Sequence, residues 1–272
     1  MVRESWICVH CGVDFPPAIT PMAACPICAD ERVARPPVQR WTKMSEMGRA
    51  HRTVTRELEP GLLTGVAIEP TFGIGQRAIL IEQPDGCILF DCIPLLDDSI
   101  AAYIAARGGL KAIVPSHPHF YGAMLSWSER FDDAKIYIHA ADREWIPQLS
   151  PAIELWAGES RCVADGLTLV HCGGHFEGGT VLHVAAGAGG RGSLLTGDVV
   201  MVTENGRGVS FMRSYPAYIP LEATQIRHIA RVLEPFQFEK IYGFLWTRVI
   251  ERDGSRLVAR TADRYLNVLA AS

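Results

Sequence analysis

The chain has 272 residues, of which 48% are hydrophobic and 21% are charged, and its formal net charge at pH 7 is −4. This length can bury a full hydrophobic core, and the composition is that of an ordinary globular protein. The weak negative charge gives no indication of nucleic acid or an anionic membrane as a partner. We expect a cytoplasmic protein, because no apolar run reaches the ~20 residues of a membrane span and the N-terminus lacks a signal-peptide pattern.

Residues 1–31 contain many turn formers and two Cys-x-x-Cys pairs. The pairs are Cys8 with Cys11 and Cys25 with Cys28, and thirteen residues separate them. Each pair can present two thiolates to one tetrahedral ion, and such an ion replaces the core that a short segment lacks. In a reducing compartment, this clustering indicates a metal site rather than disulfides. We therefore predict a structural zinc ribbon. It is either a small element that the ion holds together and that has no recognition role, or a surface that recognises a protein partner.

Residues 32–57 are charged and contain proline, and we interpret them as a linker that packs on a main domain at 58–272. Apolar spacing in that domain predicts strands that alternate with helices but also occur in pairs, which favours a mixed α/β sandwich. The predicted elements are strands at 62–68, 77–82 and 87–90, a helix at 97–107, a strand at 111–114, a helix at 122–130, a strand at 135–139, a short helix at 141–146, strands at 161–164, 167–171, 180–185 and 193–197, a helix at 220–233, a strand at 238–242 and a helix at 255–269.

Four polar residues stand where predicted strands end. His117 and His119 follow an apolar strand, and alternate side chains of an extended chain point the same way, so the two imidazoles can close on one ion. His175 lies in a glycine-rich turn between two strands, and Asp198 ends another apolar strand. Any one of these residues alone is more often structural, but four of them at strand ends indicate a metal site.

With these residues the chain resembles the metallo-β-lactamase fold superfamily, which includes the glyoxalase II hydrolases, over about residues 60–245. The family's Gly-His-Thr-x-Gly motif matches residues 174–178, and its strand ending in Gly-Asp matches residues 197–198. The resemblance implies a four-layer αββα sandwich with the metal at one edge. It also implies that Asp91, which ends an earlier strand, orients a histidine ligand.

The chain departs from the family's His-x-His-x-Asp-His motif. Tyr121 and Gly122 stand where the family has Asp and the last His, and no histidine falls near residues 242–247, where the family has its final ligand. The ligands of the first ion are all present, whereas those that belong only to the second ion are missing. The resemblance therefore implies a site for one ion instead of two.

A single Zn²⁺ with three histidine ligands and an open position lowers the pKa of a bound water to about 7. Asp198 would be a fourth ligand or the base for that water, and Tyr121 could donate a hydrogen bond to an oxyanion. We therefore predict a mononuclear hydrolase that acts on an ester, thioester or amide of a small-molecule substrate.

Two alternatives stay open. His117, His175 and Asp198 could form the two-histidine, one-carboxylate face that suits Fe(II) and oxygen chemistry, as in the persulfide dioxygenases of the superfamily. A protein that has lost one metal site could also keep the other in a binding module without catalysis. The ion at the histidine site is thus either Zn²⁺ or Fe(II), and no pattern indicates an oligomeric state.

Overall fold

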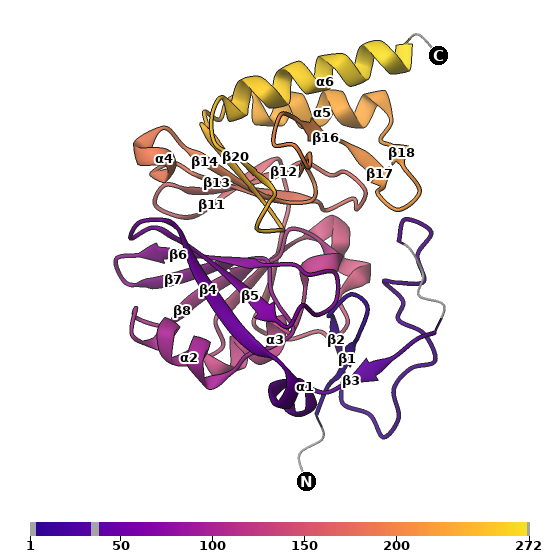
Figure 1. Cartoon of the computed structure of the whole chain (residues 1–272), viewed down its shortest axis with the longest axis vertical. Helices are drawn as coiled ribbons and strands as arrows, with labels where there is room; N and C mark the ends of the chain where they lie inside the picture. The colour runs from indigo at the N-terminus through magenta and orange to yellow at the C-terminus, as the bar shows by residue number, and fades with distance from the viewer. Residues whose placement is uncertain (1–3, 34–37, 271–272) are drawn as a thin grey trace. The chain divides into compact units, whose positions relative to one another are not determined.

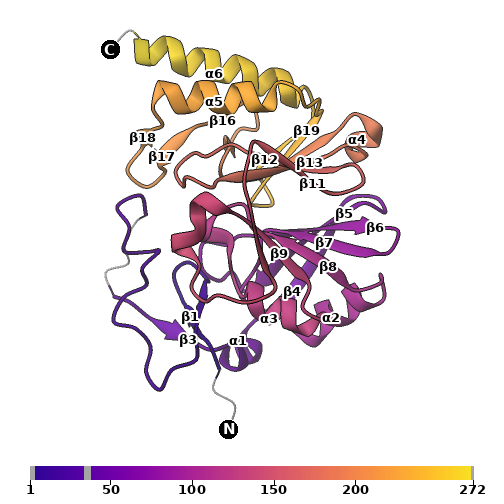
Figure 2. The same ribbon diagram turned by 180° about the vertical axis from the view of Figure 1, so that it is seen from behind.

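The computed structural model of the chain describes residues 4–33 and 38–270. The chain divides into two compact units, which are coloured indigo to magenta and mainly orange to yellow in Figures 1 and 2. The first unit comprises residues 1–138 and 143–155, and the second comprises residues 139–142 and 156–272.

A seven-stranded sheet makes up most of the first unit, in the order β10-β9-β8-β7-β6-β5-β4. The strands from β4 to β7 pair antiparallel, whereas β7, β8 and β9 run parallel. Every residue of β7 is buried, as expected of a central strand that is covered on both faces. The strands are β4 Arg52–Glu59, β5 Leu63–Glu69, β6 Ala78–Gln83, β7 Gly86–Phe90, β8 Leu110–Val114, β9 Lys135–His139 and β10 Ile153–Trp156.

Helices α2 and α3 pack on this sheet, and Ile104 and Trp127 bring them into its hydrophobic core. Helix α2 begins at Asp97, whose carboxylate accepts the N–H groups of Ile100 and of Thr53 in β4. This capping aspartate satisfies the free end of the helix and ties it to the edge of the sheet. The helices are α1 Met44–Ala50, α2 Asp98–Ala105 and α3 Met124–Arg130, with 3₁₀ turns η1 Pro118–Phe120 and η2 Ala140–Trp145.

The N-terminal segment forms a small sheet in the order β2-β1-β3, from β1 Trp6–Cys8, β2 Asp14–Phe15 and β3 Trp41–Thr42. Its buried side chains, among them Ile7, Val13 and Ile27, belong to the same hydrophobic cluster as the residues beneath α2 and α3. The segment is therefore packed into the core of the first unit.

The second unit is built on a six-stranded sheet in the order β11-β12-β13-β14-β19-β20, and α5 and α6 lie together on one face of it (Figures 1 and 2). Ile226, Ile229 and Val258 of these helices pack with Val181 and Leu194 of the sheet. The elements are β11 Ser160–Ala164, β12 Leu167–His171, β13 Thr180–Val184, α4 Gly187–Gly190, β14 Ser193–Gly197, β15 Met201–Val202, β16 Val209–Ser210, β17 Met212–Ser214, β18 Ile219–Pro220, α5 Ala223–Leu233, β19 Lys240–Gly243, β20 Val249–Ile250 and α6 Gly254–Ala270.

The strands and helices predicted for the main domain are confirmed, with shifted ends. The helix predicted at 220–233 begins at Ala223, because Pro220 belongs to β18 and a capping box of Glu222 and Gln225 sets the first turn. The short helix predicted at 141–146 is the 3₁₀ turn η2.

The predicted linker at 32–57 contains α1 and most of β4, which the sequence did not reveal. Strand β4 is mostly polar and ends the order of the sheet, so it lacks the apolar alternation of a half-buried strand. The three-part division of the chain stays a prediction. Its residues outside the described part are 1–3 of the ribbon, 34–37 of the linker and 271–272 of the main domain.

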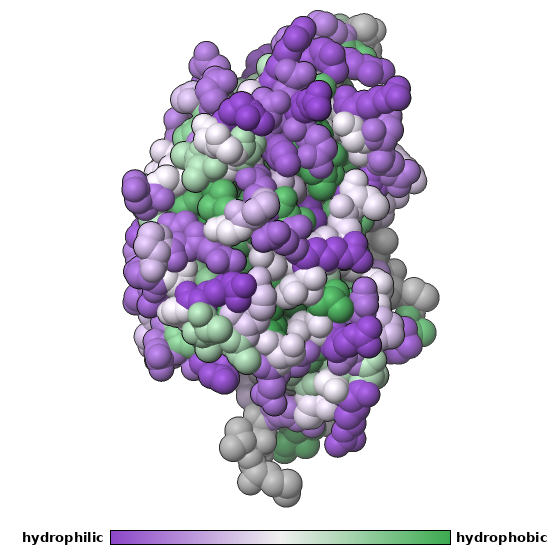
Figure 3. Space-filling model, turned by 60° about the vertical axis from the view of Figure 1, so that its left-hand side comes forward, coloured by the Kyte–Doolittle hydropathy of each residue, from purple (hydrophilic) through white to green (hydrophobic). Residues whose placement is uncertain are grey.

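Hydrophilic side chains dominate the face of the molecule shown in Figure 3, and apolar side chains occur there in small groups. Among the described residues, none of the helices combines the length and the apolar character needed to cross a membrane.

Candidate metal centres

The four N-terminal cysteines form a compact, buried cluster. The Sγ atoms of Cys8 and Cys28 are 3.8 Å apart, as are those of Cys11 and Cys25, and all four lie within 4.8 Å of one another. These separations greatly exceed the ~2.05 Å of a disulfide bond. Four sulfurs at ~2.3 Å from an ion in tetrahedral geometry are ~3.8 Å apart. The cluster therefore has the dimensions of a metal–thiolate site and fits a zinc ribbon.

A tight turn and a glutamine hold the cysteines in place. Gly12, at a φ of +82°, donates its N–H to the carbonyl of Cys8 at 2.9 Å. Gln39 donates from Nε2 to Sγ of Cys8 at 3.2 Å and accepts the N–H of Cys25 at 3.1 Å. Hydrogen bonds from the neighbouring thiols, that of Cys11 first, hold the pKa of Cys8 well below its ordinary value. The pKa of Cys25 is also lowered, whereas those of Cys11 and Cys28 are raised, so the spacing of the four sulfurs, and not their titration, indicates the metal site.

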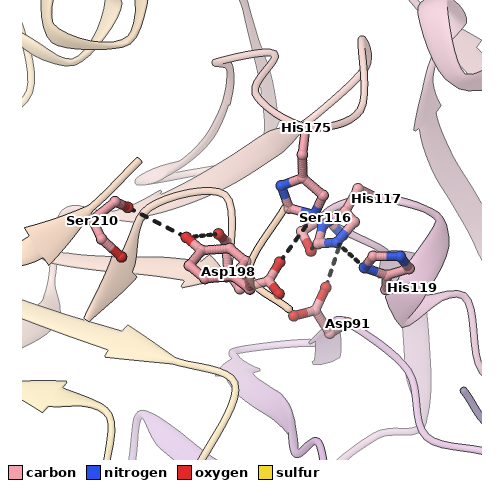
Figure 4. A network of polar contacts seen from close by, with 8 residues as sticks. Asp91, Ser116, His117, His119, His175, Asp198 and Ser210 are labelled. Atoms are coloured by element: carbon pink, nitrogen blue, oxygen red, sulfur yellow. Dashed lines mark hydrogen bonds and ion pairs between the residues drawn. The ribbon is translucent and has the colours of Figure 1, made fainter. Parts of the chain in front are cut away.

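His117 and His119 lie in the loop after β8 (Figure 4). Asp91, just after β7, accepts the N–H of Ser116 at 2.8 Å, and Oγ of Ser116 lies 3.0 Å from Nδ1 of His117. Nε2 of His117 then faces Nδ1 of His119 at 3.2 Å. Two nitrogens at ~2.05 Å from one tetrahedral ion are ~3.3 Å apart, so this pair has the spacing of two ligands. Asp91 orients the pair through Ser116.

Burial keeps His117 neutral. Its side chain is 1% exposed, and the loss of hydration, followed by the charge of Arg32, lowers its pKa to about 3. Arg32 is itself buried and binds both carboxylate oxygens of Asp30. At neutral pH the imidazole of His117 is therefore in the unprotonated form that a metal ion requires.

His175 and Asp198, both buried in the second unit, form another pair. His175 lies in the turn between β12 and β13, where Gly173 and Gly174 adopt φ values of +65° and +112° that favour glycine. Asp198 directly follows β14, and its Oδ1 lies 3.4 Å from Nε2 of His175 (Figure 4). This separation is again close to the ~3.3 Å between two ligands of one tetrahedral ion.

Tyr215 supports the second pair. Its hydroxyl donates to the backbone carbonyl of Asp198 at 2.9 Å, and its ring lies edge-on to that of His175 with the centroids 6.0 Å apart. Burial raises the pKa of Tyr215 well above its ordinary value, so the hydroxyl remains a donor. At the start of α5, Gln225 donates from Nε2 to the carbonyl of Gly174 at 3.3 Å. No local sequence pattern distinguishes such supporting residues, and the sequence analysis missed them.

His117, His119, His175 and Asp198 are a group of side chains that could hold a metal ion. They are the four ligands expected from the sequence. Three imidazole nitrogens and one carboxylate oxygen form a donor set that both Zn²⁺ and Fe(II) accept. The donor chemistry and the spacing within each pair therefore fit a metal of this kind.

The positions at which the family carries further ligands are occupied differently. Tyr121 is 1% exposed and packs in the hydrophobic core of the first unit. Gly122 has a φ of +51°, and a Cβ built on it would lie 2.6 Å from the carbonyl oxygen of Cys92. A histidine at position 122 would therefore require the backbone to move. Residues 242–247 include no histidine, so the chain lacks all three of these ligands.

Three further histidines gather in the second unit, away from any pattern in the sequence. The rings of His139 and His171 stack with their centroids 3.7 Å apart, and His228 lies edge-on to His171 at 6.0 Å. Burial, and then the neighbouring His171, lower the pKa of His139 to about 4. Because the three residues come from β9, β12 and α5, only the folded structure reveals that they meet.

Comparison with known proteins gives consistent results. The family model of the metallo-beta-lactamase superfamily matches residues 72–243. The uncharacterized protein YmaE of Bacillus subtilis (strain 168) is 40% identical over 268 residues, which are 97% of this chain and 96% of that protein. The crystal structure of VMB-1 at pH 5.5 covers 81% of this chain and 99% of its own, with a TM-score of 0.60 and 15% identity. The DIM-1 metallo-beta-lactamase exposed to ceftazidime covers 79% of this chain and 98% of its own, with a TM-score of 0.59 and 11% identity.

The two solved structures share the fold of this chain, and they confirm the predicted fold class. Because the family model spans more than half of the chain and the bacterial relative spans nearly all of it, the chain belongs to the metallo-β-lactamase superfamily.

Proposed function

We propose that the chain is a metal-dependent hydrolase in which His117, His119, His175 and Asp198 hold one Zn²⁺. The observation that carries this proposal is the spacing of the two pairs. Their ligand atoms are 3.2 and 3.4 Å apart, which is the separation of neighbouring ligands on a tetrahedral ion. Membership of the superfamily supports hydrolysis, and DIM-1, a solved structure with the same fold, is a metallo-beta-lactamase, an enzyme that opens an amide bond.

The chemistry divides between the ion and the protein. A zinc ion in this site supplies an activated water near neutral pH and polarises a carbonyl group. With three histidines on the ion, Asp198 would be either a further ligand or the base that accepts the proton of the attacking water, and Tyr215 fixes the backbone from which Asp198 extends. Ser116 and Asp91 keep the ring of His117 in one orientation. The substrate class is a small molecule with an ester, thioester or amide bond.

Tyr121 is proposed as the donor to the oxyanion that forms during hydrolysis, a role that requires its buried hydroxyl to face the histidine site from the core of the first unit. A neutral phenol can donate such a hydrogen bond but is a poor base. Replacing Tyr121 by Phe should lower kcat by on the order of 100-fold and leave the metal content unchanged. An unchanged kcat would remove Tyr121 from the mechanism.

The test combines metal analysis with assays on esters, thioesters and lactams. The wild-type chain should hold about two ions, one on the cysteines and one on the histidines, and the second should be zinc rather than iron. His119→Ala should lose one ion and the hydrolytic activity together. The matched control is His51→Ala, because His51 lies on the same unit and its ring contacts the carbonyl of Pro70 and the ring of Phe72, which are not part of the candidate site.

Retention of both ions by His119→Ala would contradict the assignment of the ligands. A wild-type chain with a filled histidine site but no turnover across the panel would support a binding module instead. Oxygen consumption by an iron-loaded chain with thiol or persulfide substrates would favour the oxygenase alternative.

A further inference from the structure

The cysteine-bearing segment directly contacts the loop that carries His117 and His119. The N–H of Asp14 donates to the carbonyl of Gly122 at 3.1 Å, and Gly122 closes that loop. On its other side the loop is fixed by Cys92, whose N–H donates to the carbonyl of Phe120 at 2.9 Å. The histidine loop is therefore held between the N-terminal segment and the chain that follows β7.

Gly122 packs tightly against the backbone of Cys92. A Cβ at this position would lie 2.6 Å from the carbonyl oxygen and 2.7 Å from the carbonyl carbon of Cys92. Both contacts are to backbone, which cannot rotate away as the end of a flexible side chain can. The position at which the family has a ligand of the second ion is thus a close backbone contact in this chain.

A second contact joins the cysteine cluster itself to the first unit. Gln76 is 3% exposed, and its Nε2 donates to the carbonyl of Cys11 at 3.1 Å. Gly12, the next residue, sits so close to Gln76 and Pro94 that a Cβ would lie 3.1 Å from each. The turn that contains Cys8 and Cys11 therefore packs against Gln76 and Pro94, and Pro94 closely follows Cys92, which contacts the histidine loop.

The two groups also share one hydrophobic core. Val13 and Phe15 flank Asp14 and are buried in the cluster that contains Tyr121, Met124 and Trp127. An N-terminal segment of this size has few residues with which to form a core of its own, so an ion on its cysteines would add to the order that this packing provides. Loss of order in this segment would therefore expose the residues that pack behind the histidine loop.

We propose that the cysteine cluster positions the histidine site. An ion on the four cysteines would fix the turn that contains Cys8 and Cys11. The hydrogen bond from Gln76 and the Asp14–Gly122 contact then hold the loop on which His117 and His119 bind their own ion. This inference rests on the proposed function, because it assumes that the histidines hold a metal. Asp14 and Gln76 are positioning residues that touch neither ion.

The first experiment removes one thiolate from the full-length chain. Cys25→Ser should weaken the binding of Co²⁺ at the histidine site by on the order of 10-fold to 100-fold, as loss of a supporting contact does in other metal sites. The two sites are separable by absorption, because thiolate ligands give a near-ultraviolet charge-transfer band that nitrogen and oxygen ligands do not. Cys162→Ser is the control, since Cys162 is exposed and its thiol donates to the carbonyl of Ala164, away from both candidate sites.

Because Cys25→Ser could unfold the whole first unit, a milder variant provides a second test. Gln76→Ala retains every metal ligand and removes the hydrogen bond to Cys11. It should keep the thiolate band and still lower the Co²⁺ affinity of the histidine site by about 10-fold. Gln83→Ala is its control, because the amide of Gln83 donates only to the neighbouring carbonyl of Glu82. Rescue by Gln76→Asn is not expected, because the shorter side chain does not reach Cys11.

Equal Co²⁺ affinities of the histidine site in the wild type, Cys25→Ser and Gln76→Ala would overturn this inference and leave the proposed function intact. A wild-type chain that binds no ion at the histidines would instead overturn the proposed function. The two failures are distinguishable, because the wild-type spectrum alone decides the second.

Discussion

The two candidate metal centres differ in how the chain builds them. The cysteine cluster takes all four ligands from one short segment, Cys8 to Cys28, and its sulfurs close around a single point. The histidine set consists of two pairs that follow the ends of strands, and each pair is oriented by other polar groups, His117 by Ser116 and Asp198 by Tyr215. A closed thiolate site is typical of a structural metal, whereas a mixed histidine–carboxylate site is typical of a catalytic one.

The two sites therefore differ in whether an ion or the packed strands supply most of their order. The cysteine segment adds few apolar side chains to the core of the first unit, so we expect an ion on the four thiolates to contribute much of its order. The histidines are placed by strands β8, β12 and β14, which the hydrophobic cores stabilise without any ion. We therefore expect loss of the cysteine ion to disturb the histidine site, and loss of the histidine ion to leave the cysteine cluster unchanged.

The largest expected effect is on stability. Cys11→Ser should lower the free energy of unfolding of the metal-loaded chain by about 4 kcal/mol or more, because the ion orders a whole segment. His119→Ala should lower it by about 1 kcal/mol, since the loop keeps its backbone contacts. Urea unfolding with saturating zinc measures both values. Equal losses of unfolding free energy in the two variants would contradict the expectation that the cysteine site stabilises the fold more than the histidine site does.

A smaller effect is expected from the glycine that joins the two centres. Gly122→Ala combines an unfavourable positive φ with a backbone clash and should cost about 3 kcal/mol. Gly61→Ala is the matched control, because Gly61 has a φ of +66° with open space around it and should cost only about 1 kcal/mol. If both variants lost the same stability, Gly122 would not be a close contact between segments.

Two buried groups, Asp14 of the first unit and His139 of the second, should respond to pH in opposite directions. In the first unit, burial, with the charge of Glu129 adding to it, raises the pKa of Asp14 to about 7. The folded chain therefore retains a proton that the unfolded chain loses near pH 4, and the contribution of Asp14 to stability falls as the pH rises from about 4 to 7. Asp14→Asn should remove this pH dependence. The free energy of unfolding of the variant relative to the wild type should be ~1–3 kcal/mol higher at pH 8 than at pH 4.

The smallest expected effect concerns the histidine stack of the second unit. The pKa of His139 is lowered from 6.5 to about 4, so the unfolded chain takes up a proton first and stability is lost as the pH falls from about 6.5 to 4. His139→Phe keeps an aromatic ring against Trp156 and His171 and should flatten this loss by about 1 kcal/mol. Denaturation curves from pH 4 to 8 test it, and an unchanged slope would contradict it.

The sequence revealed the parts of the molecule whose signals are local. The Cys-x-x-Cys pairs, the His-x-His loop and the Gly-Asp strand end are short patterns, and the apolar strands of both sheets have clear periodicity. Strand β4 was missed because it is a polar edge strand, which propensity alone does not separate from a linker.

Contacts between distant segments could not be read from the sequence. The approach of Gly122 to Cys92, the hydrogen bond from Gln76 to Cys11 and the support of Asp198 by Tyr215 each depend on where the fold brings two loops together. A glycine or a buried tyrosine has many structural uses, and only the tertiary environment shows which one applies.

The central claim is that the chain holds one ion on four thiolates and one on the histidine set. X-ray absorption at the zinc edge of the metal-loaded, full-length protein tests it most directly. Two such sites predict an average of about two sulfur neighbours at ~2.3 Å and about two nitrogen or oxygen neighbours at ~2.0–2.1 Å for each zinc. An average of about four sulfurs, with no nitrogen or oxygen shell, would mean that only the cysteines bind and would contradict the claim.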